Sequence, residues 1–276
     1  MGHFILTGAN GGIGKATTVE LKSRDHTLVP INRSEADLSL MREINRLADD
    51  LLARTDRLDG LLLNAGVASS GAVLTSEGFE ETFAVNHLGA FLLAHRLLPL
   101  LERDSPGRIV LTGSSDHMAV NEVRVADIAT TTDYGYTRAY ANSKAVAMAA
   151  MLEMAQRLKP EVSEESNQDE QPSFVRANVA DPGWTRTGLT RNAPMPIRLL
   201  VRVGRPLQNR PRHSARVLAN LATETADTGT YTGINGPLTT SVLLRDELFR
   251  RTVYGDTVQL LVEHGFAKPD DFLPER

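Results

Sequence analysis

Tyr140 and Lys144 lie four positions apart in an alanine-rich run that predicts a helix over residues 138–158. Four residues make about one helical turn, so the phenol and the ammonium project from the same face. A free tyrosine has a pKa of about 10, and a fixed neighbouring cation favours its phenolate form. The pair is therefore a candidate proton donor with its activator. Tyrosine and lysine also occur at this spacing by chance on solvated helix faces, so the rest of the chain must supply the context.

The amino-acid composition limits the kinds of protein and of functional site that this chain can form. The chain has 276 residues, of which 41% are hydrophobic and 23% charged, as expected for one large globular domain. Its net charge of -4 does not indicate a nucleic-acid partner, and the lack of cysteine excludes disulfides, thiolate metal sites and a cysteine nucleophile. We expect a cytoplasmic protein, because no basic leader precedes the first apolar strand and no apolar run is long enough for a transmembrane segment.

A glycine-rich turn follows the first predicted strand, at residues 4–7, and precedes a predicted helix at 15–22. Glycines let the backbone approach a pyrophosphate, and a helix N-terminus offers unpaired N–H groups and a positive dipole end. A lone glycine turn is more often just a tight turn, but its position at the first strand-to-helix junction favours a dinucleotide site. The residues of this candidate cradle are Gly8, Asn10, Gly12, Ile13 and Gly14.

Apolar runs and amphipathic stretches alternate along the chain. Strands are also predicted at residues 27–31, 58–63, 108–112 and 174–180, and helices at 41–54 and 76–101. Only a few residues separate the second strand from Asp37, so the expected crossover helix is missing there. The alternation predicts an α/β fold, with residues 1–276 forming a single-domain Rossmann-type, doubly wound parallel sheet with helices on both faces. Ligands of such sheets lie at the carboxyl ends of the strands, where this chain places its glycine, serine and asparagine clusters.

Seven motifs, in this order, resemble those of the short-chain dehydrogenase/reductase family over nearly the whole chain. They are Thr7-Gly8-x-x-x-Gly12-Ile13-Gly14, Asp37-Leu38, Asn64-Ala65-Gly66, Asn86, Ser114, Tyr140-x-x-x-Lys144 and Pro182-Gly183-x-x-x-Thr187. Residues 75–93 are most similar to the branch that holds retinol dehydrogenases, WW-domain oxidoreductases and light-dependent protochlorophyllide reductases. The light-dependent reductases rely on cysteine, so that particular activity is not expected here.

The resemblance implies an NAD(P)-dependent oxidoreductase that acts on a carbonyl or secondary alcohol. In the family, tyrosine exchanges a proton with the substrate oxygen, serine hydrogen-bonds that oxygen, lysine lowers the tyrosine pKa and holds the nicotinamide ribose, and asparagine supports a proton-relay water. These catalytic roles fall on Tyr140, Ser114, Lys144 and Asn86. Hydroxyl donors would stabilise charge on the substrate oxygen, so no metal is needed. Two structural alternatives are that Asn86 pairs with backbone groups in its helix and that Ser114 is a turn residue.

The family's cofactor-binding positions are carried over by the same motifs. They fall on Gly8, Asn10, Gly12, Ile13, Gly14, Arg33, Asp37, Leu38, Asn64, Ala65, Gly66, Tyr140, Lys144, Pro182, Gly183, Thr185 and Thr187.

The reactive serine is expected to be Ser114 rather than Ser115, since alternation along the strand points its neighbour to the other side. The interval from Ser114 to Tyr140 is about double the family's usual separation, so an insertion is expected between them. Asp116, His117 and Asp133 lie in this insertion. Without a helical pair of ligands, we interpret them as solvated loop residues rather than as a metal site.

Cofactor choice depends on the end of the second strand. An acidic residue there would bind the ribose 2′-hydroxyl, whereas this chain has Asn32 and Arg33, and a guanidinium can pair with a 2′-phosphate. We therefore expect NADP to be preferred, with NAD as the other option. The alternative is that Arg33 points to solvent in the shortened loop.

A substrate lid is expected at about residues 188–212. No Asp or Glu occurs between Trp184 and Arg216, whereas arginine stands at positions 186, 191, 198, 202, 205, 210, 212 and 216. An amphipathic helix is predicted over residues 196–203. Two interpretations remain open: an apolar lid over a largely apolar substrate with solvated arginines, or arginines that attract an anionic substrate, a carrier-bound acyl group or an acidic membrane surface.

Two other classes of function remain as alternatives to the enzyme. A catalytically silent cofactor sensor would be expected to have lost Tyr140 or Lys144, and both are present. An interaction scaffold would show a large apolar patch or an appended module. The substrate, the reaction direction and the choice between monomer and homo-oligomer are left open by the sequence.

Overall fold

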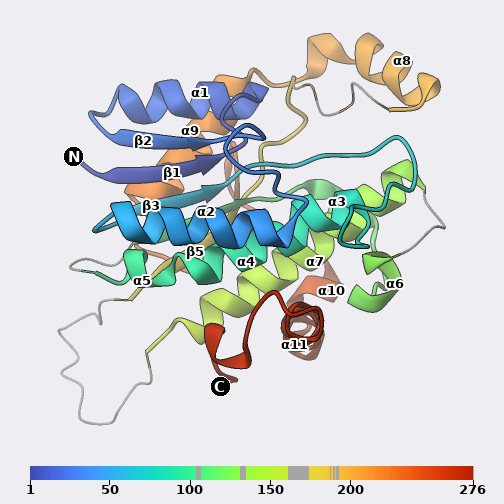
Figure 1. The fold of residues 1–276 in the computed structure, drawn as a ribbon. Coiled ribbons are helices and arrows are strands. Elements are labelled where there is room, and N and C mark those ends of the chain that lie inside the picture. Colours follow the sequence, from blue (N-terminus) through green and yellow to red (C-terminus); the bar gives the residue numbers. More distant parts are fainter. Residues whose placement is uncertain are drawn as a thin grey trace.

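A central β-sheet with strand order β2-β1-β3-β4-β5-β6-β7 organises the chain (Figure 1). The computed structural model describes residues 1–103, 107–130, 135–160, 174–186, 188, 190 and 193–275. Neighbouring strands run parallel from β2 to β6, and β7 is antiparallel to β6. The strands are β1 (His3–Thr7), β2 (Thr27–Ile31), β3 (Gly60–Leu63), β4 (Arg108–Thr112), β5 (Arg176–Ala180), β6 (Tyr231–Gly233) and β7 (Gly236–Pro237). The predicted doubly wound α/β sheet is confirmed.

Helices cover both faces of the sheet because alternate strand residues point to opposite sides. Phe4 and Leu6 of β1 pack with α1 (Gly12–Lys22) and α9 (Pro211–Thr223). Ile5 of the same strand joins the larger core on the other face. That core contains α2 (Met41–Arg54), α4 (Gly89–Arg96), α7 (Tyr136–Arg157) and α11 (Glu247–Glu263). The remaining helices are α3 (Glu81–Phe83), α5 (Leu98–Leu101), α6 (Val125–Ala129), α8 (Met195–Val203) and α10 (Val242–Arg245), with 3-10 turns at Ser115–Ala119, Arg205–Leu207 and Pro269–Asp271.

The short connection after β2 has the form that the sequence predicts. Residues 32–40 contain no helix, and the chain passes directly from β2 to α2. β2 is an edge strand of the sheet, which explains how it accommodates Pro30, a residue that cannot donate to a neighbouring strand. From β1 the chain moves to one side, to β2, and then crosses back to β3 on the other side. The switch point, where ligands of such sheets bind, lies between β1 and β3.

The helix predicted over residues 76–101 is wrong in its start and in its continuity. Gly78 has a positive φ of 87°, and the Glu80 side chain accepts hydrogen bonds from the backbone N–H groups of Thr82 and Phe83, so the helix begins at Glu81. The segment Ala84–Leu88 is a π-helix, and a break at Leu97 precedes α5. Pro99, which lacks an N–H group, lies in the first turn of α5. Hydrophobic periodicity alone did not reveal these interruptions.

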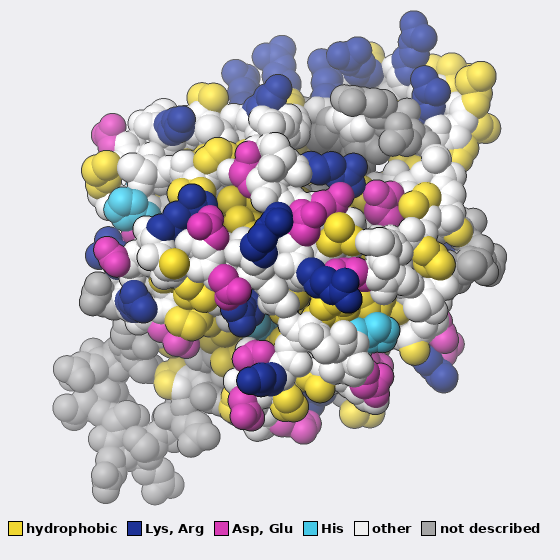
Figure 2. Space-filling model, in the orientation of Figure 1, with side chains coloured by type: hydrophobic (Ala, Val, Ile, Leu, Met, Phe, Trp, Pro, Cys, Tyr) yellow, Lys and Arg dark blue, Asp and Glu magenta, His cyan; other side chains and the backbone are white. Residues whose placement is uncertain are grey.

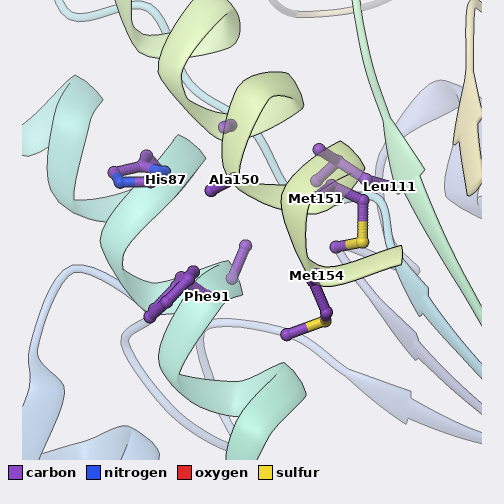
Figure 3. A pocket seen from close by; sticks show the side chains of 8 residues that line it. His87, Phe91, Leu111, Ala150, Met151 and Met154 are labelled. Atoms are coloured by element: carbon purple, nitrogen blue, oxygen red, sulfur yellow. The ribbon is translucent and has the colours of Figure 1, made fainter. Parts of the chain in front are cut away.

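A small apolar cavity of about 10 Å³ lies between α7, α4 and the π-helix Ala84–Leu88. Figure 3 shows His87 and Phe91 facing Ala150, Met151 and Met154 of α7 across this space. Such a volume holds about one water molecule, so this cavity is a packing feature and not a substrate site.

The imidazole of His87 is fixed in this core by Thr257 of α11. Its Nε2 lies 2.8 Å from Thr257 Oγ1, and that hydroxyl donates its proton to the carbonyl of Val253 at 2.6 Å. The imidazole must therefore donate through Nε2, and its Nδ1 has no hydrogen-bond partner. His95, also on the α4 side, lies 2.7 Å from the Tyr254 hydroxyl. Both histidines link the C-terminal helix to the core.

Acid is expected to destabilise the protein through these two histidines. Burial lowers the pKa of His87 to about 3 and that of His95 to about 4. Between about pH 6.5 and pH 4 the unfolded chain binds protons that the folded chain does not bind. The free energy of unfolding should therefore fall with pH by up to ~1.4 kcal/mol per unit for each histidine. Urea unfolding at neutral pH and near pH 5 measures this change, which His87→Gln should roughly halve and the surface substitution His3→Gln should leave intact.

In the part of the chain that the structure describes, no helix combines the length and the apolar character needed to cross a lipid bilayer.

Candidate active site

The glycine turn between β1 and α1 has a backbone that only glycine accommodates. Gly8 has a φ of +67°, and a Cβ placed on Gly14 would lie 2.1 Å from the Gly8 carbonyl oxygen. Gly11 caps α1 without a side-chain hydrogen bond, so the first N–H groups of the helix are not used by a cap. Because α1 begins at Gly12 rather than at the predicted Lys15, the backbone of Gly12 and Ile13 belongs to this first turn. The cradle fits a pyrophosphate.

The ends of β1 and β3 meet beside this cradle. A Cβ on Gly8 would lie 2.9 Å from the Cα of Ala65. Asn64 donates from Nδ2 to the carbonyl oxygens of Thr7 (3.1 Å) and Gly8 (3.3 Å), and the Thr7 hydroxyl accepts the backbone N–H groups of Asn64 and Ala65 at 3.0 Å. The amide of Asn64 thus ties the strand ends together and holds the glycine turn in place.

Gly66, Asn86 and Lys144 converge at the end of β3. A Cβ on Gly66 would lie 3.3 Å from Asn86 Oδ1 and 3.5 Å from Lys144 Nζ. Asn86 is buried in the π-helix, accepts the N–H of Val67 at 2.8 Å, and donates to the Val67 carbonyl and to Ser143 Oγ, both at 2.9 Å. The backbone that Asn86 pairs with is thus the loop after β3 rather than its own helix, and this pairing holds the amide next to the lysine.

Lys144 is a buried cation with a defined position. Its Nζ donates to the carbonyl of Thr112 at 2.8 Å and lies 5.9 Å from the centroid of the Tyr140 ring. Burial lowers the pKa of Lys144 to about 8, against an opposing effect of the Asp116 carboxylate. The ammonium is thus held beside the phenol, as the four-residue spacing predicts.

The Ser114 hydroxyl lies close enough to the Tyr140 phenol to lower the pKa of that phenol. Ser114 also lies beside Asp116, because its Oγ donates to Asp116 Oδ2 and accepts the Asp116 N–H, both at 3.2 Å. Burial raises the pKa of Tyr140, and the negative charge of Asp116 raises it further, while the hydrogen bond with Ser114 opposes this shift. The expected lowering of this pKa is therefore not found, because burial is the largest influence on the phenol and raises its pKa.

His117 corrects the interpretation of the insertion as solvated. Its side chain is fully buried; its Nδ1 lies 2.6 Å from the Ser114 carbonyl oxygen, and its Nε2 accepts the N–H of Ser241 at 3.2 Å. Nδ1 must therefore carry the proton. The imidazole joins the loop of Ser114 to the start of α10, a contact between residues far apart in the sequence. Asp116 is exposed as expected, and Asp133 lies outside the described residues.

The loop after β5 is fixed by its own side chains and by one side chain of α9. Gly183 has a φ of +62°, and its N–H is accepted by Asp181 Oδ1 at 2.7 Å. Thr185 Oγ1 lies 2.8 Å from Ser214 Oγ, which donates to the Pro182 carbonyl at 2.8 Å. These bonds hold Pro182, Gly183 and Thr185 against the start of α9. Thr187, the last residue of this predicted motif, lies outside the described residues.

The predicted adenosine end of the site contains an ion-pair cluster. The Arg33 guanidinium lies 3.3 Å from Asp37 Oδ2 and 3.3 Å from Glu81 Oε1, and its side chain is 67% exposed. Asn32 accepts the N–H of Asn10 at 2.8 Å, which places this loop directly beside the glycine turn. The carbonyl of Leu38 packs on the helix at Gly89, where a Cβ would lie 2.4 Å from it. The Arg33 side chain is thus exposed to solvent, but its guanidinium forms ion pairs with two carboxylates.

The residues that the sequence analysis singled out therefore gather at one edge of the sheet. The sequence indicated only solvated loop residues at Asp116 and His117 and no role for Asp181, but all three contact or position this group. Their positions next to Ser114 and Pro182 in the sequence could have indicated that they lie at the site, since residues next to a strand-end motif share its location.

Comparison with known proteins supports the resemblance to the short-chain dehydrogenase/reductase family. A model of the short chain dehydrogenase family matches residues 31–196. Retinol dehydrogenase 14 of Mus musculus is 32% identical over 238 residues, covering 74% of this chain and 66% of that protein. Retinol dehydrogenase 13 of Homo sapiens is 32% identical over 212 residues, covering 68% of this chain and 60% of that protein. The chain thus spans less than two thirds of the length of these relatives.

Solved structures support the fold. An uncharacterised protein of Mycobacterium paratuberculosis superposes with a TM-score of 0.73 at 23% identity, covering 94% of this chain and 93% of that one. The 3-alpha-hydroxysteroid dehydrogenase of Pseudomonas sp. B-0831, solved in complex with NADH, gives a TM-score of 0.63 at 25% identity, covering 84% of this chain and 94% of that one. With its motifs gathered at the switch point of such a sheet, the chain belongs to the short-chain dehydrogenase family.

Proposed function

We propose that the protein is an NADP-dependent oxidoreductase that transfers a hydride between the nicotinamide and a carbonyl or secondary alcohol, with Tyr140 as acid and base. The observation that carries this proposal is the convergence of Tyr140, Ser114, Lys144 and Asn86 beside the glycine turn. Family membership supports the same activity.

The proposed reaction depends on the protons that Tyr140 and Ser114 carry on their side-chain oxygens. A bound nicotinamide supplies or accepts the hydride. In reduction, Tyr140 gives its phenolic proton to the substrate oxygen, and the Ser114 hydroxyl donates to the same oxygen; in oxidation Tyr140 takes the proton back. Ser114 must turn its proton from Asp116 to the substrate for this role. The Lys144 ammonium stabilises the phenolate that remains after proton transfer.

The residues around the glycine turn fit a dinucleotide. Gly8, Gly12, Ile13 and Gly14 would hold the pyrophosphate through their backbone, which is packed so closely at Gly8 and Gly14 that no Cβ fits there. Lys144 and Tyr140 would hold the nicotinamide ribose, and Asp37 and Leu38 lie at the adenosine end with Arg33.

Arg33 supports the preference for NADP within this proposal. Its guanidinium is exposed beside the glycine turn, although its partners Asp37 and Glu81 are only 28% and 25% exposed, and it can exchange these ion pairs for a 2′-phosphate. Charge-assisted hydrogen bonds contribute ~1.5–3 kcal/mol, so Arg33→Gln should weaken NADPH binding about 10- to 100-fold and leave NADH binding unchanged. Titration of cofactor fluorescence measures both affinities.

Two further variants sharpen the test of cofactor choice. Glu81→Gln removes a carboxylate that competes for Arg33, so NADPH affinity should rise. Arg46→Gln removes an exposed arginine from α2 as a control. A clear NADH preference of the unaltered protein would contradict the assignment, and equal affinities for both cofactors would favour an Arg33 that only faces solvent.

Asp116 is expected to set the pH dependence of the reaction. Its charge opposes ionisation of Tyr140, so Asp116→Asn should lower the pKa of that phenol. The rise of kcat/KM with pH in alcohol oxidation should then move to lower pH. Asp127→Asn, an exposed carboxylate on α6, is the matched control. An unchanged profile, or one displaced to higher pH, would show that Asp116 does not act on the tyrosine.

A largely apolar small molecule is the proposed substrate class, in keeping with the names of the retinol dehydrogenases that this chain resembles. The lack of cysteine fits a reducing compartment, and we extend the proposal to the cytoplasm. The decisive assay offers NADPH and NADH with a panel of ketones and aldehydes, and the oxidised cofactors with alcohols. Tight cofactor binding without turnover of any compound would instead favour the catalytically silent sensor.

A further inference from the structure

The helix α8 forms an exposed corner of the molecule. It stands apart from the sheet in Figure 1, and Figure 2 shows dark blue side chains along this edge with hydrophobic side chains beside them. We call α8 together with Trp184 and Arg205 the α8 surface. This surface combines an apolar stripe with a run of positive charge, and neither the proposed chemistry nor the fold requires that combination.

The apolar stripe consists of Met195, Leu199 and Val203. These residues recur every four positions, so they lie on one side of α8, and they are 77%, 60% and 71% exposed. Ile197 and Val201, on another side of the helix, are only half-exposed. α8 therefore has one apolar side that is partly covered and a second one that lies in water. A continuous exposed stripe of large apolar side chains is typical of a surface that contacts a partner.

Positive charge borders this stripe without compensation. Arg198 and Arg202 are exposed and one turn apart, and among the described residues neither forms an ion pair. Elsewhere, exposed arginines such as Arg54 on α2 are matched by a carboxylate one turn away. Since no Asp or Glu occurs between Trp184 and Arg216, the surface presents one sign of charge. Its partner should be anionic.

Trp184 lies at the end of the same surface. Its ring packs on Gly204, where a Cβ would lie 2.1 Å from ring atom Cη2, and the residue is 48% exposed. Indole side chains favour the boundary between hydrocarbon and lipid headgroups. Trp184 is also the only tryptophan of the chain, which makes it a reporter for this one location.

We propose that the α8 surface docks the protein on an anionic lipid bilayer, with the stripe of Met195, Leu199 and Val203 inserted among the headgroups and the arginines paired with lipid phosphates and carboxylates. An amphipathic helix with arginines beside an apolar stripe binds membranes in this way, through buried apolar area and electrostatic attraction. A second copy of the chain fits less well, because a symmetric contact would bring the unpaired arginines of both copies together.

Vesicle binding of the full chain tests the proposal directly and does not depend on enzymatic activity. We expect the protein to cosediment with vesicles of phosphatidylcholine and phosphatidylserine but not with vesicles of phosphatidylcholine alone. Added salt should weaken the binding. The emission of Trp184 should shift to shorter wavelength only with the anionic vesicles, since the indole then leaves water.

Paired variants separate the two components of the surface. Arg198→Gln with Arg202→Gln should reduce partitioning about 25-fold, because each arginine near an anionic surface contributes about a factor of five. The matched control is Arg46→Gln with Arg54→Gln, which removes the same charge from α2. Leu199→Asp should abolish binding, whereas Leu248→Asp, at a residue on α11 that is 73% exposed, should not. Unfolding midpoints of all variants establish that the fold is intact.

Three results would overturn the proposal. The first is absence of binding to anionic vesicles, and the second is equal loss of binding in the α8 variants and their controls. The third is a dimer in light scattering that Leu199→Asp converts to a monomer, since a second copy would then be the occupant of the stripe.

Discussion

Replacing Tyr140 by phenylalanine is expected to lower kcat by ~10²–10⁴-fold, the usual contribution of general acid–base catalysis. The substitution removes the phenolic oxygen and keeps the ring, so packing around α7 changes little. Cofactor affinity and the unfolding midpoint should stay close to those of the unaltered protein. Steady-state kinetics with a substrate found by the assay, together with cofactor titration, measure the three quantities.

The contrast with a neighbouring tyrosine makes this expectation specific. Tyr231 is also a buried phenol near the site, but it donates its proton to Asp181, so it is engaged in the framework. Tyr231→Phe should affect stability more than turnover. A Tyr140→Phe protein that keeps most of its kcat would remove Tyr140 from the role of acid and leave the family membership untouched.

Replacing Lys144 by methionine is expected to abolish turnover and yet to stabilise the cofactor-free fold. Lys144 is only 3% exposed, and burial lowers its pKa to about 8 from an ordinary value of 10.5. The shift corresponds to ~3 kcal/mol of unfavourable free energy at pH 7, offset by ~1 kcal/mol from the hydrogen bond to Thr112. Methionine fills a similar volume without charge, so we expect a gain of about 1–3 kcal/mol in the free energy of unfolding.

The pH dependence of this gain identifies its cause. Between about pH 8 and pH 10.5 the unfolded chain keeps a proton on Lys144 that the folded chain has lost, so the stability of the unaltered protein rises with pH in this window. The advantage of Lys144→Met should shrink accordingly. Denaturant unfolding at neutral pH and near pH 10 measures the difference, and Lys22→Met, a surface substitution at the end of α1, is the control. A variant that is less stable than the unaltered protein at pH 7 would show that the lysine supports the fold.

Local elements of this protein were predictable because they depend on residues close in sequence. The alternation of apolar runs and amphipathic stretches identified the parallel sheet, the glycine turn marked the junction of β1 and α1, and the few residues between Ile31 and Asp37 excluded a crossover helix. The amphipathic period over residues 196–203 likewise matched α8. Each of these signals lies within one element or one connection, where periodicity and turn chemistry act directly.

Contacts between distant segments were decided only by tertiary packing. The sequence showed Arg33 near Asp37, but not that the folded chain adds Glu81 to the same guanidinium. It placed His117 in a solvated insertion, whereas Ser241 and the Ser114 carbonyl bury that imidazole. The pKa of Tyr140 depends on burial and on Asp116, and neither is visible in a spacing of four residues. Burial and charge act through space, so their effects on these side chains exist only once the sheet has brought the strand ends together.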